Sequence, residues 1–176
     1  MHRKSEKKKK GAISPLFYYK LIMINLESIN GFLAETLEGT DIFVVEVTIK
    51  PGNRIFIYLD SLNKIDIKDC VKITRKINAN FDREVENYGL EVSSAGLTSS
   101  FKVPQQYLKN IGKKVKLKTK DGLVIRGLLA DFKDETVKIE EQTKVKGKIT
   151  NTEHSIDIKN ILEIKVDIIF FNSKEL

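Results

Sequence analysis

The spacing of apolar residues predicts a helix at the start of the first half. One stripe at helical spacing is formed by Leu26, Ile29, Leu33 and Leu37. Asn25 is expected to cap the first turn and Gly39 to end the helix. The segment 25–39 is therefore predicted to be an amphipathic helix.

The period then changes to two, which is typical of strands. One side of this alternation is formed by Phe43, Val45, Val47 and Ile49. Pro51-Gly52 follows, where proline presets the first central position of a turn and glycine accepts the positive φ of the second. RIFIYL is then the returning strand, so the pattern predicts a β-hairpin.

A second helix is predicted over residues 66–82. Asp66 is expected to cap it, with Asp69 three residues further on. Its buried stripe is expected to contain Cys70, Ile73, Ile77 and Phe81. YGLEVSS follows as a third strand. The order helix–strand–strand–helix–strand predicts an α/β domain in which two helices cover one face of a three-stranded sheet.

The second half contains short strand patterns and tight turns, after a short helical or turn segment, PQQYLKNI. Asp121-Gly122 is a hairpin signal, and Gly127 lies within a strand, where glycine permits a sharp bend. These features predict a small, strongly bent antiparallel barrel, and the fold class is α+β. The polar residues 141–154 favour an exposed loop or an extended hairpin.

Charge is distributed unevenly along the 176 residues. The net charge of +7 divides into +6 for residues 1–22, −4 for residues 23–96 and +5 for residues 97–176. We therefore expect an acidic first domain, 23–96, and a basic second domain, 97–176. An acidic part joined to a basic part suggests a partner that exposes both signs, such as a ribonucleoprotein.

Residues 1–22 leave three interpretations open. The basic start and apolar stretch superficially resemble a signal peptide, but Pro15 and Lys20 interrupt the stretch and no A-x-A-like site follows. A disordered basic arm that touches nucleic acid is the second. The third, which we favour, is an extension upstream of a true start at Met23.

Few residues are available for metal or redox chemistry. Cys70 is the only cysteine, which excludes an intramolecular disulfide, and His2 and His154 lie far apart in the sequence. Three carboxylates gather near the second helix: Asp60, Asp66 and Asp69. Since acids at a helix start are explained by capping, we predict no metal and no cofactor. A reducing, cytoplasmic location and no transmembrane helix are expected.

Lysines provide the clearest surface signal. In KKVKLKTK, lysines alternate with Val115 and Leu117, which places the ammonium groups on the outer face of a strand and the apolar residues inside. The candidate RNA- or ribosome-binding residues are Lys113, Lys114, Lys116, Lys118, Lys120 and Arg126. Phosphate binding and simple solubilisation of a sheet edge are equally compatible with this pattern.

The segment GLEVSSAGLTSSF joins the two halves. Ser93 and Ser94 lack the glycine spacing of a hydrolase elbow and a neighbouring histidine base, and the glycines do not form a phosphate-binding loop. We therefore expect no catalysis here. Residues Ser93, Ser94, Ala95 and Gly96 are interpreted as an interdomain joint.

From about Met23 to Phe171 the chain resembles the bacterial RimP family of ribosome maturation factors. The resemblance lies in IYLDSLNKIDIKDCVKITRKINANFD, in LEVSSAGLTSSF and in NIGKKVKLKTKDGLVIRGLLADFKDETVKIE. In the second stretch Ala95 stands where the family usually has proline. Thr98-Ser99-Ser100 stand where Asp-Arg-Pro is common, and Lys102 is a candidate replacement for that arginine.

The resemblance implies an amino-terminal α/β domain followed by a Sm-like, Src-homology-3-like barrel. It also implies a cytoplasmic, non-enzymatic role in assembly of the small ribosomal subunit, through contacts with rRNA or ribosomal proteins. We expect transient binding to the precursor by a monomer, with no membrane and no small-molecule substrate. A general RNA-binding module is the alternative function, and an rRNA-modifying enzyme is a further rival.

Overall fold

A computed structural model describes residues 24–81, 87–145 and 148–168. The helices are α2 (Leu26–Leu37), α3 (Ile67–Asn80) and α4 (Pro104–Lys109), with a 3-10 turn, η1, at Ile158–Asn160. The strands are β1 (Ile42–Lys50), β2 (Arg54–Ser61), β3 (Gly89–Ser94), β4 (Lys114–Thr119), β5 (Val124–Lys133), β6 (Thr136–Val145), β7 (Lys148–Asp157) and β8 (Ile161–Val166). The predictions for residues 1–22, Met23 and His2 lie outside the described residues.

Both predicted helices of the first half begin at capping boxes. The Asn25 side chain accepts the Ser28 amide N–H and the Ser28 hydroxyl accepts the Asn25 N–H, at 2.9 and 3.0 Å. Asp66 and Asp69 form the same reciprocal pair at the start of α3. Each box provides partners for backbone N–H groups that a helix start leaves without one, so the capping predictions are confirmed.

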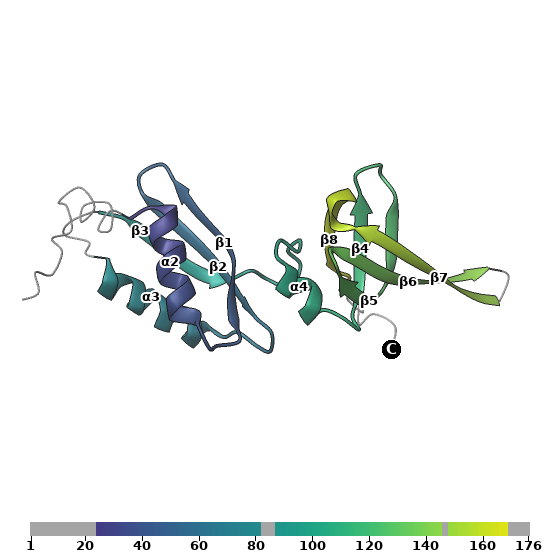
Figure 1. Ribbon diagram of the computed structural model, residues 1–176, viewed down its shortest axis with the longest axis horizontal. Helices are drawn as coiled ribbons and strands as arrows, with labels where there is room; N and C mark the ends of the chain where they lie inside the picture. Colours follow the sequence, from purple (N-terminus) through teal and green to yellow (C-terminus); the bar gives the residue numbers. More distant parts are fainter. Residues whose placement is uncertain (1–23, 82–86, 146–147, 169–176) are drawn as a thin grey trace, which may run out of the picture.

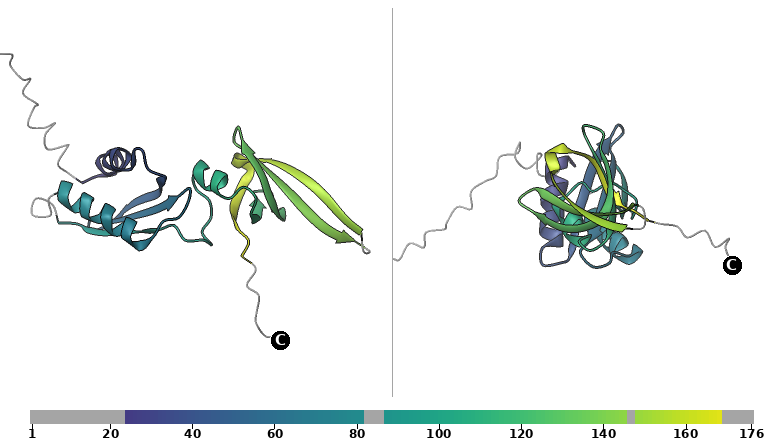
Figure 2. Two further views of the ribbon diagram at one scale, coloured as in Figure 1. Left: turned by 90° about the horizontal axis from the view of Figure 1, so that it is seen from below. Right: turned by 90° about the vertical axis from the view of Figure 1, so that its right-hand side faces the viewer.

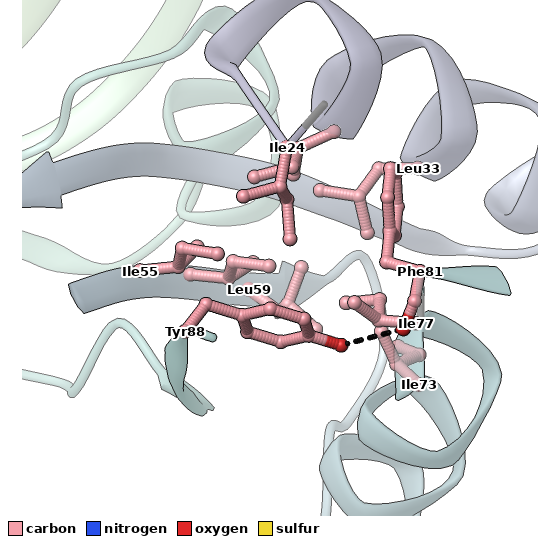
Figure 3. Packing of buried hydrophobic residues seen from close by; sticks show 10 residues of the cluster. Ile24, Leu33, Ile55, Leu59, Ile73, Ile77, Phe81 and Tyr88 are labelled. Carbon is pink, nitrogen blue, oxygen red and sulfur yellow. Dashed lines mark hydrogen bonds between the residues drawn. The ribbon is translucent and has the colours of Figure 1, made fainter. Parts of the chain in front are cut away.

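The first half is a three-stranded sheet in the order β1-β2-β3, covered on one face by α2 and α3 (Figure 1). β1 and β2 are antiparallel, whereas β3 returns parallel to β2 after α3. The helices pack on the β2 side chains Ile55, Ile57 and Leu59. Figure 3 shows this core, in which the Tyr88 hydroxyl donates a 3.0 Å hydrogen bond to the carbonyl of Phe81. The predicted αββαβ order is confirmed.

A bulge in β1 changes which of its residues face the helices. The pairing with β2 shifts between Val44 and Glu46, so the inward alternation moves by one position. The β1 residues that pack on the core are Ile42, Val44, Val47 and Ile49. The prediction that Phe43 and Val45 share a face with Val47 and Ile49 is therefore wrong. Leu26 is also exposed rather than buried on the predicted helical stripe.

The second half is a five-stranded antiparallel sheet in the order β7-β6-β5-β4-β8, preceded by α4. Its buried side chains form a second core, separate from the first: Phe101, Tyr107, Val115, Leu117, Ile125, Leu129, Val137, Ile139 and Ile164. Gly127 lies in β5, where a Cβ atom would come within 2.3 Å of the carbonyl oxygen of Glu140. Glycine is therefore required for the close approach of β5 and β6. The α+β class is confirmed.

The described residues of the segment 141–154, which are 141–145 and 148–154, belong to an extended hairpin rather than to a polar loop. Strands β6 and β7 pair continuously from Thr136↔Asp157 to Val145↔Lys148. In Figure 2 this pair projects beyond the rest of the sheet. Of the two alternatives that the sequence left open, the hairpin is correct. Polar side chains are compatible with strands here because both faces of a projecting hairpin contact solvent.

Candidate nucleic-acid interface

The lysine row lies on β4 as the alternation predicts. Val115 and Leu117 are completely buried, and the lysines point to the opposite face. Lys116 pairs with Arg126 of β5 on one side and with Lys165 of β8 on the other. Three cationic side chains from three neighbouring strands therefore lie in one line across the sheet, with residues at adjacent strand positions only about 5 Å apart.

One carboxylate lies within this cationic surface. Glu163 of β8 pairs with Lys118, and its side chain accepts a 2.7 Å hydrogen bond from Lys165. That hydrogen bond and the charge of Lys165, followed by the charges of Lys116 and Lys118, lower the pKa of Glu163 below its ordinary value. Glu163 is therefore ionised at neutral pH and compensates part of the positive field.

The predicted binding residues divide into two groups. Lys114, Lys116, Lys118 and Arg126 share the outer face of β4 and β5. Lys113 instead precedes β4, and its ammonium group donates to the Asn110 side-chain oxygen at 3.0 Å. Lys120 lies in the turn after β4. We refer to Lys114, Lys116, Lys118, Arg126 and Lys165 as the β4 cationic surface.

Lys165 was missed because its neighbours in the sequence, ILEIKVD, carry no lysine alternation. It joins the surface only through the pairing of β8 with β4, which brings Lys165 next to Lys116 from 49 positions earlier in the chain. The apolar-polar alternation of β8, in which Ile164 is buried, was the only local signal that Lys165 points outward.

The joint between the halves is held by a backbone hydrogen bond. The Ala95 N–H donates to the carbonyl of Leu59 at 2.9 Å, which extends the pairing of β3 with β2 by one residue. Proline has no N–H, so alanine provides a contact here that proline does not. Gly96 then adopts a positive φ of 77°, which favours glycine. Leu97 is 74% exposed and does not pack, whereas Phe101 is buried.

Among the residues that the structure describes, two ion pairs connect the halves beyond this joint. Lys109 of α4 donates to Asp60 at the end of β2 at 2.5 Å, and these side chains are only 14% and 16% exposed. Lys102 pairs with Glu46 of β1, and both are more exposed. Lys102, the candidate replacement for the family arginine, therefore contacts β1 of the first half. Next to the Lys109 pair lies a groove of about 510 Å³, lined by residues of both halves.

The remaining candidate residues have structural partners. Asp66 and Asp69 form the helix cap, and Asp60 binds Lys109. Cys70 is buried in α3, and burial raises the pKa of its thiol. His154 lies 3.0 Å from Glu141 across the β6–β7 hairpin. Within the described ranges, no group of three or more His, Cys, Asp or Glu residues is arranged to hold a metal ion, and no helix is long and apolar enough to cross a membrane.

Comparison with solved structures gives similarity to Sm proteins. A heptameric archaeal Sm protein is 24% identical, with a TM-score of 0.29, over 36% of this chain and 97% of that one. The SmAP1 heptamer of P. aerophilum gives the same identity and TM-score and is covered over 89% of its chain.

Comparison of sequences gives longer matches. The model of the RimP N-terminal domain matches residues 32–98. The ribosome maturation factor RimP of Porphyromonas gingivalis is 38% identical over 124 residues, which are 70% of this chain and 82% of that protein. RimP of Christiangramia forsetii is 36% identical over 138 residues, 76% of this chain and 90% of that one. The chain therefore belongs to the RimP family of ribosome maturation factors.

Proposed function

We propose that this protein acts in maturation of the small ribosomal subunit, by transient and non-catalytic binding to the precursor particle in the cytoplasm. The observation that carries the proposal is the β4 cationic surface in a member of a ribosome maturation family. Its centre is the line Arg126–Lys116–Lys165 across three strands. Side chains of this type neutralise RNA phosphates and release their counterions, which gives salt-dependent binding.

The β4 cationic surface suits an RNA backbone better than it suits single bases. Its exposed neighbours are the aliphatic Val124 and Leu128, and none of the cations alternates with an aromatic residue along β4. Stacking of bases requires a planar side chain, whereas phosphate contacts require only cations in register. We therefore infer that this surface positions the protein on structured rRNA without reading its sequence.

The acidic first domain is proposed to meet a basic ribosomal protein. Helix α2 and its C-cap carry Glu27, Glu35 and Glu38, which are exposed, and α2 has no lysine or arginine. The helix therefore presents an acidic side on the face of the molecule away from the β1-β2-β3 sheet. Complementary charge accelerates encounter with a cationic partner and orients it.

We further propose that residues 23–96 and 97–176 are separate domains of a monomer without cofactor or small-molecule substrate. The two separate hydrophobic cores support this division. Each domain buries its own apolar side chains, so each has the feature that independent folding requires. The joint Ser93–Gly96 then has a structural role.

Sedimentation of cell extracts through a density gradient tests the function. The intact protein should migrate with free small subunits, and Lys116→Glu plus Lys118→Glu should reduce this comigration and flatten its salt dependence. A matched control is Lys68→Glu plus Lys72→Glu on α3. Equal binding of the intact protein to any RNA would favour a general RNA-binding module instead. Deletion of the gene without accumulation of precursor rRNA would contradict the assembly role.

A non-catalytic role predicts that Ser93→Ala and Ser94→Ala leave maturation intact. Both serines lie at the end of β3, where their backbones pair with Tyr58 and Leu59 of β2. Processing of rRNA that stops with either alanine variant, while the folded protein remains abundant, would establish an enzyme.

A further inference from the structure

The β1-β2-β3 sheet has a second face that the helices do not cover. On β2 the residues alternate, so that Ile55, Ile57 and Leu59 face the helices and Arg54, Phe56 and Tyr58 face away. Register places Thr48 and Glu91 on either side of Phe56, and Glu46 and Ser93 on either side of Tyr58. We call this surface the open sheet face.

The two aromatic residues lie in the middle of the open sheet face, on its central strand. Phe56 and Tyr58 are two positions apart, which corresponds to about 7 Å along a strand. Both side chains are partly exposed. Adjacent aromatic rings on a central strand form a platform on which planar groups can stack.

Two cations lie over one of these rings. The Lys50 ammonium group lies over the Phe56 ring, 4.6 Å from its centroid, and the Arg54 guanidinium carbon lies over the same ring at 5.5 Å. Both cations come from the β1–β2 hairpin end, where Lys50 pairs with Arg54. Gly89 on the neighbouring strand has no side chain, and a Cβ atom there would lie 3.7 Å from Cγ of Arg54, in ordinary van der Waals contact. The hairpin end therefore brings two positive charges to the Phe56 ring.

Two carboxylates near the aromatic rings would repel an anion, and only one of them is neutralised by a cation. Glu46 is paired with Lys102. Glu91 is exposed beside Phe56 and opposes the positive field locally. The cationic end and the aromatic centre therefore remain the features that distinguish this face from the acidic side at α2.

We propose that the open sheet face binds single-stranded RNA. One base stacks on Tyr58 and another replaces Lys50 and Arg54 over the Phe56 ring, and these two long side chains turn to the phosphates. Stacking needs unpaired bases, and sheets that present aromatic residues on neighbouring positions bind RNA in this way. The cations complement the phosphate charge. The proposal rests on the proposed function only in that a ribosomal precursor supplies unpaired RNA; the site itself is distinct from the β4 cationic surface.

A single-stranded partner fits this face better than an RNA duplex does. Paired bases are stacked within a duplex and do not offer their faces to a side chain, so a duplex would leave the two rings without a partner. An acidic protein segment would use Lys50 and Arg54 but would gain less from the aromatic platform. Competition by duplex RNA and by an acidic peptide therefore separates the three partners.

The test uses the full chain and a short, fluorescently labelled single-stranded RNA, with binding followed by anisotropy. Phe56→Leu and Tyr58→Leu keep apolar volume but remove the ring, and each should weaken binding about tenfold. Lys50→Gln plus Arg54→Gln should weaken binding and reduce its salt dependence. The matched control is Lys68→Gln plus Lys72→Gln, which removes the same charge from exposed positions of α3 behind the sheet. Glu91→Gln should strengthen binding.

Photocrosslinking provides a second measurement that does not depend on variants folding. RNA carrying a photoreactive nucleobase should crosslink to the tryptic peptide of residues 55–64, which contains both rings. Unlabelled single-stranded RNA should compete, whereas duplex RNA and an acidic peptide should not. Crosslinks confined to β4 and β5, or unchanged affinity of folded Phe56→Leu and Tyr58→Leu proteins, would overturn the inference. If either result were found while the protein still comigrated with small subunits, the inference would fail but the proposed function would stand.

Discussion

The Lys109–Asp60 ion pair is predicted to stabilise the arrangement of the two domains. The perturbation is a double-mutant cycle with Lys109→Met, Asp60→Asn and both together. The Nζ–Oδ1 distance is 2.5 Å, and the side chains are only 14% and 16% exposed. Hydrogen bonds between charged groups contribute about 1.5–3 kcal/mol, and removal of one partner leaves the other charge poorly solvated. We therefore expect a coupling free energy of about 2 kcal/mol.

The chain contains its own comparison for this cycle. The Lys102–Glu46 pair also joins the halves, but its side chains are 47% and 35% exposed. Solvent screens such a pair, so its coupling free energy should be below about 1 kcal/mol and should fall further in salt. The Lys109–Asp60 coupling should be less sensitive to salt because water has less access to it.

Urea unfolding followed by circular dichroism measures the free energies, and small-angle X-ray scattering measures the domain arrangement. The single variants should broaden the distribution of interatomic distances, whereas the double variant tests whether the two side chains act through each other. A coupling free energy below about 0.5 kcal/mol, with unchanged scattering, would refute the argument from burial. Equal coupling for the two ion pairs would refute it as well.

Other changes have expected results that follow from single contacts. Gly127→Ala should lower the free energy of unfolding by about 3 kcal/mol, because the new Cβ would meet the Glu140 backbone. Denaturation measures this free energy, and an unchanged value would show that β5 and β6 separate easily. Glu163→Gln should strengthen rRNA binding and steepen its salt dependence, as measured by anisotropy, since Lys165 loses its carboxylate partner. Ser61→Ala should raise the pKa of Asp41 in an NMR titration, because the hydrogen bond from Ser61 is the largest cause that lowers this pKa, followed by the hydrogen bond from Asn63. Because the fold lowers the pKa of Asp41, this carboxylate stabilises the folded state at pH values above its ordinary pKa of 3.8, and that stability is lost as the pH falls through the lowered pKa. The Ser61→Ala variant should therefore lose less stability in acid.

Features set by neighbouring residues were predictable from the sequence. Both capping boxes depend on side chains three positions apart, and the Pro51-Gly52 turn depends on two adjacent residues. The alternation around Val115 and Leu117 also fixes which side of β4 is buried. These signals are local because helix and strand periodicity repeat within a few residues.

Features set by pairing between distant segments were not predictable. The β1 bulge depends on how Val44 and Glu46 meet β2, and a shift of one residue reverses the face of every earlier side chain. Lys109 and Asp60 are 49 positions apart in the sequence, and no local pattern around either residue indicates its partner. The same holds for Lys165 in the β4 cationic surface.

The contacts at the joint fix the position of the two proposed RNA-binding surfaces relative to each other. Ala95 bonds to Leu59 at the end of β2, and Lys109 bonds to Asp60 one residue further along the same strand. The first contact fixes the start of the joint on β2 and the second ties the second domain to the same strand, which also carries Phe56 and Tyr58. Two weak RNA contacts on one frame bind a single particle more tightly than either does alone, because the first fixes the effective concentration of the second. A fixed separation of the two surfaces therefore favours binding to a folded rRNA precursor, in which duplex and unpaired segments also have a set separation. Short RNA reaches only one surface and should bind less tightly.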